Sequence, residues 1–194
     1  ARSGRQVITM ADVEKAMIKV IAGPEKRSRV VTEKDKRITA YHEAGHATVS
    51  WVLEHANPLI KVTIIPRGKA LGAAWYLPEE RQITTKEQLL DEMASILGGR
   101  ASEQMNFGNV STGALNDLER VTKQAYAMVA YYGMSDHIGN LSFYDSSGQS
   151  DMTLTKPYSE RTAQEIDTEA KALVDSAYQR ALDTLQAHRE GLTR

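Results

Sequence analysis

Two histidines four positions apart, with a glutamate directly after the first, most constrain how this chain can fold. They lie in the segment His42-Glu43-Ala44-Gly45-His46. Residues four apart on an α-helix share one face, so His42 and His46 can bind one metal ion if the segment is helical, with Glu43 beside the ion. Catalytic zinc usually has three protein ligands and leaves the fourth position to water. The motif therefore predicts a helix here and a third ligand elsewhere.

The composition limits the kind of protein and the kind of ligand. The chain has 194 residues, of which 41% are hydrophobic and 25% are charged, as in an ordinary globular domain. It contains no cysteine, so a metal site must use His and carboxylate ligands, and an intracellular setting is favoured. No apolar run approaches the roughly 18 residues that cross a bilayer, and residues 1–6 lead into no signal peptide. We expect this piece to be soluble.

The charge is nearly balanced overall but uneven along the chain. The net charge is -1, whereas residues 1–40 carry ten Lys and Arg against five Asp and Glu. A basic arm of this kind can contact nucleic acid. The charges are scattered along predicted helices without interleaved aromatic residues, which favours solvated helix faces and no nucleic-acid partner.

Hydrophobic periodicity predicts a mainly α fold with a small β-hairpin next to the motif helix. Helices are expected over residues 10–22, 32–56, 84–107, 114–132 and 158–188, and strands over 59–65 and 73–77. Three helix starts have capping pairs, namely Thr9 with Asp12, Thr32 with Asp35, and Thr84 with Glu87. Residues 134–157 are expected to form a long, polar, mobile loop.

The motif helix should have a broad buried stripe that His42 and His46 border. The stripe consists of Ile38, Tyr41, Gly45, Thr48, Val49 and Val52. Glycine is unfavourable inside a helix, so Gly45 and the pair Gly98-Gly99 predict very close packing at those positions.

The other histidines are poor candidates for the third ligand. The metzincin pattern needs Gly and His where this chain has Val49 and Val52, which excludes that family. At about 100° per residue, His55 falls on the far side of the motif helix. His188 lies in the polar tail, and His137 lies in the long loop and is a weak candidate.

Two carboxylates are better candidates. Asp117 falls at the edge of the apolar sector of its helix, whereas Glu119 projects to the opposite side. A buried carboxylate needs a partner or a metal, although an acid at a helix N-terminus can also be stabilised by local amides. Spacing alone does not separate these two interpretations of Asp117. Glu103, at the margin of another apolar face, is a second candidate.

The motif alone is a moderate signal, because His-Glu-x-x-His arises by chance in on the order of one chain in a hundred. From pattern alone, a metalloprotease is favoured over a noncatalytic helical adaptor whose histidines are hydrogen-bonded core residues.

The chain also resembles, over its whole length, the peptidase region of the FtsH family, whose members are membrane-anchored ATP-dependent zinc metalloproteases. The resemblance rests on residues 21–26, 36–47, 64–68, 70–72, 97–101 and 111–120.

The resemblance implies a role for each matching residue. It makes His42, His46 and Asp117 the ligands of one Zn²⁺ per chain and Glu43 the catalytic general base and acid of peptide-bond hydrolysis. It places Glu103 near the zinc, where its carboxylate orients a ligand histidine.

Two further positions are compared with the family. Gln104 stands where many relatives have a second acid, and the segment Gly72–Leu77 is similar to the substrate-side strand of the family. An edge strand of this kind can hold an extended peptide by main-chain hydrogen bonds.

The resemblance also implies a division of the chain and a cellular setting. Residues 1–23 are expected to be the C-terminal helix of an ATPase lid, 24–31 a connector, and 32–194 the zinc metallopeptidase domain. The chain has no phosphate-binding loop, because Gly68-Lys69 is followed by Ala70, so ATP and Mg²⁺ are expected to act only through an ATPase domain outside it. The full-length relative is expected to be a homo-hexamer anchored in the bacterial inner membrane. Its protease domain would face the cytoplasm and cleave unfolded polypeptides.

Overall fold

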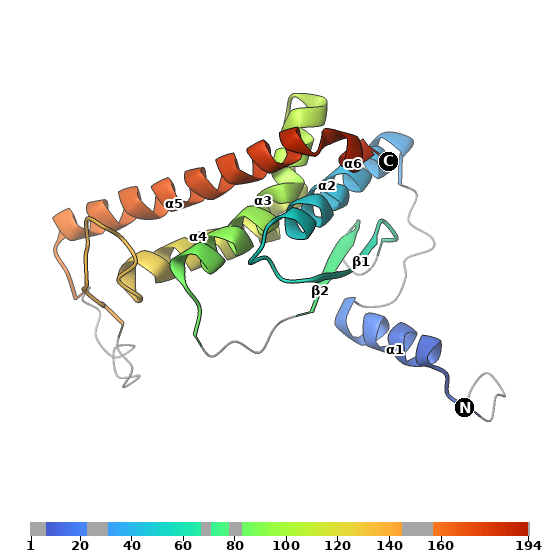
Figure 1. Ribbon diagram of the computed structural model, residues 1–194, viewed down its shortest axis with the longest axis horizontal. Helices are drawn as coiled ribbons and strands as arrows, with labels where there is room; N and C mark the ends of the chain where they lie inside the picture. The colour runs from blue at the N-terminus through green and yellow to red at the C-terminus, as the bar shows by residue number, and fades with distance from the viewer. Residues whose placement is uncertain (1–6, 23–30, 67–70, 78–82, 145–156, 194) are drawn as a thin grey trace.

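The computed structural model describes residues 7–22, 31–66, 71–77, 83–144 and 157–193, and confirms a mainly α fold with one small sheet (Figure 1). The elements in order are α1 (Met10–Ala22), α2 (Glu33–Val52), β1 (Leu59–Thr63), β2 (Ala73–Tyr76), α3 (Lys86–Phe107), the 3-10 turn η1 (Thr112–Ala114), α4 (Leu115–Ala130), α5 (Glu160–Ala187) and α6 (Arg189–Thr193).

Helix α3 is the centre of the bundle, packed against α2, α4 and α5. Its apolar face is buried, and Met93 and Leu97 are almost completely removed from solvent. Helix α5 contributes its own apolar face, which includes the buried residues Ile166, Ala177 and Leu185. These faces form one continuous core that also includes Val49 of α2 and Val121, Ala125 and Met128 of α4.

Helix α2 begins as predicted but ends earlier. The side chain of Thr32 accepts a hydrogen bond from the backbone N–H of Asp35 at 3.1 Å. The expected end near Ala56 is wrong. The helix stops at Val52 because Leu53 takes an extended conformation, with φ -78° and ψ 129°, and packs against the core.

The buried face of α2 is also rotated from the predicted stripe. His42, His46 and Val49 lie at its centre, whereas Val52 is 37% exposed. The reason is the very close approach of α3, because a Cβ atom added at Gly45 would lie 2.3 Å from the carbonyl oxygen of Gly98. The histidines therefore face α3 directly instead of bordering the interface.

The capping box of α3 is one residue later than predicted. Thr85, not Thr84, is the N-cap, and the Gln88 side chain accepts from the Thr85 backbone N–H at 2.8 Å. Both positions fit the sequence pattern, and the Glu87 side chain instead pairs with Arg180 of α5 at 3.1 Å. The predicted end of this helix at residue 107 is confirmed, because the next residue, Gly108, has a left-handed φ of 68°.

The segment after α4 is packed rather than loose. The helix ends at Ala130, two residues before the predicted end, so Tyr132 lies outside it and is 60% exposed, and Gly133 turns the chain with φ 63°. Residues 134–144 return to the bundle, where Ile138 is 7% exposed and the Phe143 N–H donates to the Ala130 carbonyl at 2.7 Å. The expected mobile loop is wrong for this part, and residues 145–156 lie outside the described residues.

The sheet consists of two antiparallel strands that lie beside α2. Thr63 pairs with Ala73 and Leu59 with Tyr76, with an irregularity between Leu59 and Lys61. Both strands are shorter than expected by one or two residues. Of the turn region that the glycines predict over residues 68–72, residues 68–70 lie outside the described residues, as does most of the connector, 24–30.

Helix α1 is separate from the bundle in Figure 1. Its start is confirmed, because the backbone N–H of Thr9 donates to the Asp12 carboxylate at 3.0 Å. The apolar side chains of Val13, Met17 and Val20 are 42%, 57% and 84% exposed.

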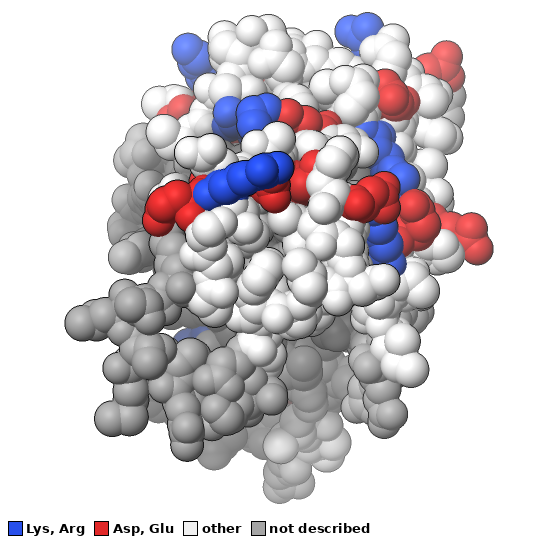
Figure 2. Space-filling model, turned by 90° about the vertical axis from the view of Figure 1, so that its left-hand side faces the viewer, with Lys and Arg blue, Asp and Glu red and all other residues white. Residues whose placement is uncertain are grey.

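The surface of the bundle carries both signs of charge. On the face shown in Figure 2, Lys and Arg are interspersed with Asp and Glu. Pairs four apart on helices, such as Lys123 with Glu119 at 2.5 Å, are typical of solvated helix faces. Within the described residues, no helix combines the length and the apolar character that a membrane crossing requires.

Gly45→Ala should destabilise the protein although alanine is the better helix former. We expect a loss of about 2 kcal/mol in the free energy of unfolding, because the clash with the α3 backbone outweighs the gain in helix propensity. Urea unfolding of the metal-free protein measures this change. Gly191→Ala is the matched control, since an added Cβ there meets nothing within 4 Å. Equal stability of Gly45→Ala and wild type would contradict the close contact.

Candidate metal centre

The two motif histidines form one face of a buried cluster. His42 and His46 are 8% and 7% exposed, and their Nε2 atoms lie 3.1 Å apart. The Nδ1 atom of His46 lies 3.0 Å from the carbonyl oxygen of Ser95. A carbonyl only accepts hydrogen bonds, so Nδ1 carries the proton and the Nε2 lone pair of His46 points into the cluster.

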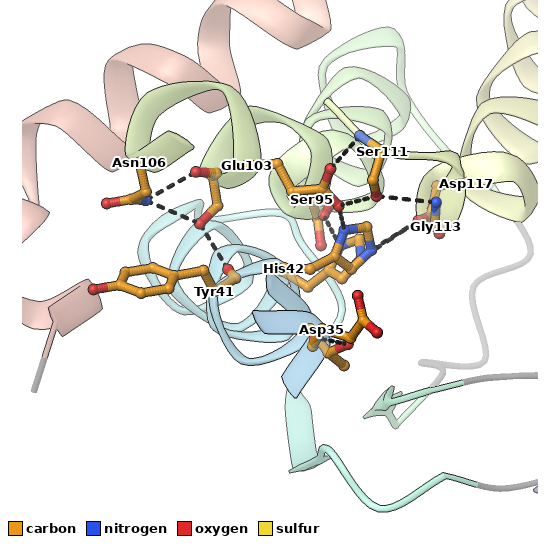
Figure 3. A network of polar contacts seen from close by, with 12 residues as sticks. Asp35, Tyr41, His42, Ser95, Glu103, Asn106, Ser111, Gly113 and Asp117 are labelled. Atoms are coloured by element: carbon orange, nitrogen blue, oxygen red, sulfur yellow. Dashed lines mark hydrogen bonds and ion pairs between the residues drawn. The ribbon is translucent and has the colours of Figure 1, made fainter. Parts of the chain in front are cut away.

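The aspartate predicted at the edge of the apolar sector completes the cluster. Asp117 lies in the first turn of α4, and its Oδ2 atom is 3.4 Å from Nε2 of His42 and 3.5 Å from Nε2 of His46 (Figure 3). One ligand atom from each of the three residues lies within 4.8 Å of the other two. Glu119 is exposed and pairs with Lys123, as its predicted direction requires.

The electrostatics of the cluster favour a cation at its centre. Burial by itself would lower the pKa of His42, but the carboxylates of Asp117 and Glu103 raise it from 6.5 to about 9. Burial would raise the pKa of Asp117, but the hydrogen bonds and charge of the two histidines hold it well below its usual range. The carboxylates of the site thus stabilise a positive charge beside them. Two imidazole nitrogens and one carboxylate oxygen fit a catalytic zinc ion.

Glu103 is a buried carboxylate behind His42. It is 2% exposed, and its Oε1 atom lies 2.7 Å from Nδ1 of His42. The backbone N–H and the hydroxyl of Ser111 donate to the same carboxylate at 2.6 and 3.0 Å. Burial alone would raise the pKa of Glu103, but His42 and Ser111 lower it. These bonds fix the ring of His42 with Nε2 toward Asp117.

Glu43 lies buried beside the cluster and against the strand segment. It is 6% exposed, and burial raises its pKa, although the charges of His46 and His42 oppose that effect. A Cβ atom added at Gly72, just before β2, would lie 2.5 Å from Oε1 of Glu43. The glycine therefore lets the backbone of the sheet pass directly along this carboxylate.

The remaining histidines lie outside the cluster. His55 follows the end of α2, and its backbone N–H donates to Asp91 at 3.3 Å. The ring of His188 lies 3.0 Å from the Thr184 carbonyl oxygen, and His137 pairs with Glu169 at 2.8 Å. Gln104, the other position compared with the family, is exposed.

Sequence reasoning missed two partners of the site. Ser95 contacts His46 through its backbone carbonyl, and because every residue has one, the sequence gives no sign of this contact. The hydroxyl and the backbone N–H of Ser111 both bind Glu103, a role that the family resemblance does not assign to this residue. Its position two residues before Gly113, whose N–H donates to the Ser111 hydroxyl at 3.1 Å, was the available signal for a structured turn.

A helical domain that places a His-Glu-x-x-His helix against an aspartate from a separate helix has the site of a zinc metallopeptidase. The pattern of Peptidase family M41 matches residues 29–194. The chain belongs to this family.

Named relatives cover almost the whole chain. An ATP-dependent zinc metalloprotease FtsH of Parabacteroides distasonis is 60% identical over 191 residues, which are 98% of this chain and 28% of that protein. One of Rhodothermus marinus is 49% identical over 195 residues, 99% of this chain and 28% of that protein. The mitochondrial inner membrane m-AAA protease component AFG3L2 of Mus musculus is 50% identical over 185 residues, 95% and 23% respectively. The chain thus spans well under a third of the length of these relatives.

Glu103→Gln should weaken metal binding without unfolding the protein. The amide keeps the shape of the side chain but removes the charge that holds the His42 ring, so we expect zinc affinity to fall about 10- to 100-fold. Competition with a chromophoric chelator measures the affinity. Glu119→Gln, on the exposed side of α4, is the control and should bind zinc as wild type does. Unchanged affinity in Glu103→Gln would show that the contact does not orient the ring.

Proposed function

We propose that this chain is the proteolytic domain of an ATP-dependent protease, with His42, His46 and Asp117 as ligands of one zinc ion and Glu43 as catalytic residue. The observation that carries the proposal is the convergence of the three ligand atoms within 4.8 Å, next to a buried glutamate. Membership of Peptidase family M41 supports the same reaction class.

Different residues of the chain have different roles in peptide hydrolysis. A bound zinc ion supplies an activated water and polarises the scissile carbonyl group. Glu43 accepts the proton of the attacking water and delivers it to the departing amine. Burial raises the pKa of Glu43, which brings it closer to the neutral range in which a group can both accept and return a proton. Asp117, with its lowered pKa, stays ionised and does not compete for that proton.

The substrate is an extended polypeptide segment that adds to β2. In the described part of the sheet, β2 pairs with β1 along one edge only. The chain entering β2 at Gly72 lies against Glu43, so a peptide on the other edge would cross the catalytic carboxylate. Main-chain hydrogen bonds of this kind recognise unfolded segments with little dependence on sequence, which suits a protease of misfolded proteins.

The longer protein provides what this domain does not. Residues 1–23 are the end of an ATPase lid, 24–31 a connector, and 32–194 the peptidase domain. The start of the family match at residue 29 and the exposed apolar side chains of α1 support this division. ATP and Mg²⁺ act through the ATPase domain. The full-length protein is a homo-hexamer in the bacterial inner membrane, with this domain on the cytoplasmic side.

Glu43→Gln should separate metal binding from catalysis. The variant should retain about one zinc per chain, because Glu43 is not a ligand, and peptide cleavage should fall by at least about 100-fold, because the proton acceptor is lost. Metal analysis and cleavage of an unstructured peptide measure the two properties. His46→Ala is the control and should lose zinc and activity together. Full activity in Glu43→Gln would exclude the proposed role, and absence of zinc from the wild type would favour a noncatalytic helical adaptor.

Assembly should be visible by light scattering. If the peptidase domains contribute to the ring, the particle mass should rise with protein concentration toward six times the 21.5 kDa of one chain. A particle mass of one chain at every concentration would contradict hexamer formation by this domain.

A further inference from the structure

The two adjacent glycines in the middle of α3 face different neighbours. A Cβ atom added at Gly98 would lie 2.7 Å from the carbonyl oxygen of Gly45, which is backbone of α2. A Cβ atom added at Gly99 would lie 2.5 Å from Nε2 of His42 and 2.6 Å from Nε2 of His46. One glycine thus permits the packing of two helices, and the other lies against the two nitrogens that face Asp117.

The two rings at Gly99 cannot move without losing a contact. The far nitrogen of His42 is held by Glu103 at 2.7 Å, and that of His46 by the Ser95 carbonyl at 3.0 Å. Both partners belong to α3, the helix that also carries Gly99. A methyl group at position 99 would therefore push the Nε2 atoms away while their opposite sides remain held. The rings would have to break a hydrogen bond or turn away from Asp117.

We propose that Gly99 is a positioning residue of the metal centre, whose missing side chain keeps both Nε2 atoms directed at the position of the ion. This inference rests on the proposed zinc site. It assigns Gly99 to ligand geometry and Gly98 to helix packing.

The two assignments differ in what a methyl group would displace. At Gly98 the obstacle is backbone, which cannot move without separating α2 from α3. At Gly99 the obstacles are the tips of two side chains, so the helices can stay in place while the rings move. Alanine is also the better helix former. Gly99→Ala should therefore fold and bind metal poorly, whereas Gly98→Ala should lose stability.

The experiment compares Gly99→Ala, Gly98→Ala and Gly191→Ala, the last being a helical glycine with nothing within 4 Å of an added Cβ. Zinc affinity is measured by competition with a chromophoric chelator, and the melting temperature is measured on metal-free protein. For Gly99→Ala we expect affinity to fall at least about tenfold, as when groups that orient metal ligands are removed. Its metal-free melting temperature should equal that of wild type. Gly98→Ala should melt lower, and Gly191→Ala should match wild type in both properties.

Visible absorption with saturating Co²⁺ gives a second measurement of ligand geometry. The cobalt bands of Gly99→Ala should differ in position and intensity from those of wild type, and those of Gly191→Ala should not. Wild-type zinc affinity and cobalt bands in Gly99→Ala would overturn the inference. So would a metal-free melting temperature as low as that of Gly98→Ala, or failure to fold, since either assigns Gly99 to packing. A wild type that binds neither metal would instead refute the proposed zinc site.

Discussion

The contact between the backbones of α2 and α3 is the constraint on which the rest of the structure depends. Gly45 and Gly98 have no side chains, so the two helices approach more closely than any pair of larger residues would allow. At this separation α3 supplies the partners of both motif histidines, namely the carboxylate of Glu103 and the carbonyl oxygen of Ser95. The orientation of the ligand atoms is therefore decided by helix packing before any ion binds.

Burial then determines how the groups of the site behave. His42, His46 and Glu43 lie within a largely apolar bundle, where an unpaired charge is strongly unfavourable. Imidazole and carboxylate lone pairs that converge in such a place repel one another unless a positive charge lies among them. The same burial moves the pKa of Glu43 upward while the histidines hold that of Asp117 down. The pKa values of two carboxylates in the same site are thus shifted in opposite directions by their surroundings.

The parts of the structure that depend on periodicity could be predicted from the sequence. The helices, the small sheet and the inward direction of Asp117 follow from spacing along the chain, and the convergence of Asp117 with the histidines agrees with it. The end of α2 and the choice between Thr84 and Thr85 did not follow, because tertiary contacts of Leu53 and Glu87 decide them. The orientation of the rings was also beyond sequence reasoning, since it depends on a backbone carbonyl and on distances between helices.

The position of Asp117 in the first turn of α4 has a topological consequence. An ion shared by His46 and Asp117 joins two points about seventy residues apart in a chain that has no cysteine. Because these ligands come together only in the folded chain, a bound ion stabilises that state by mass action, by about 2.7 kcal/mol when free zinc is at 100 times its Kd. In this protein the ion needed for catalysis would also link α2 to α4. Depletion of zinc would therefore remove catalytic activity and lower the stability of the fold together.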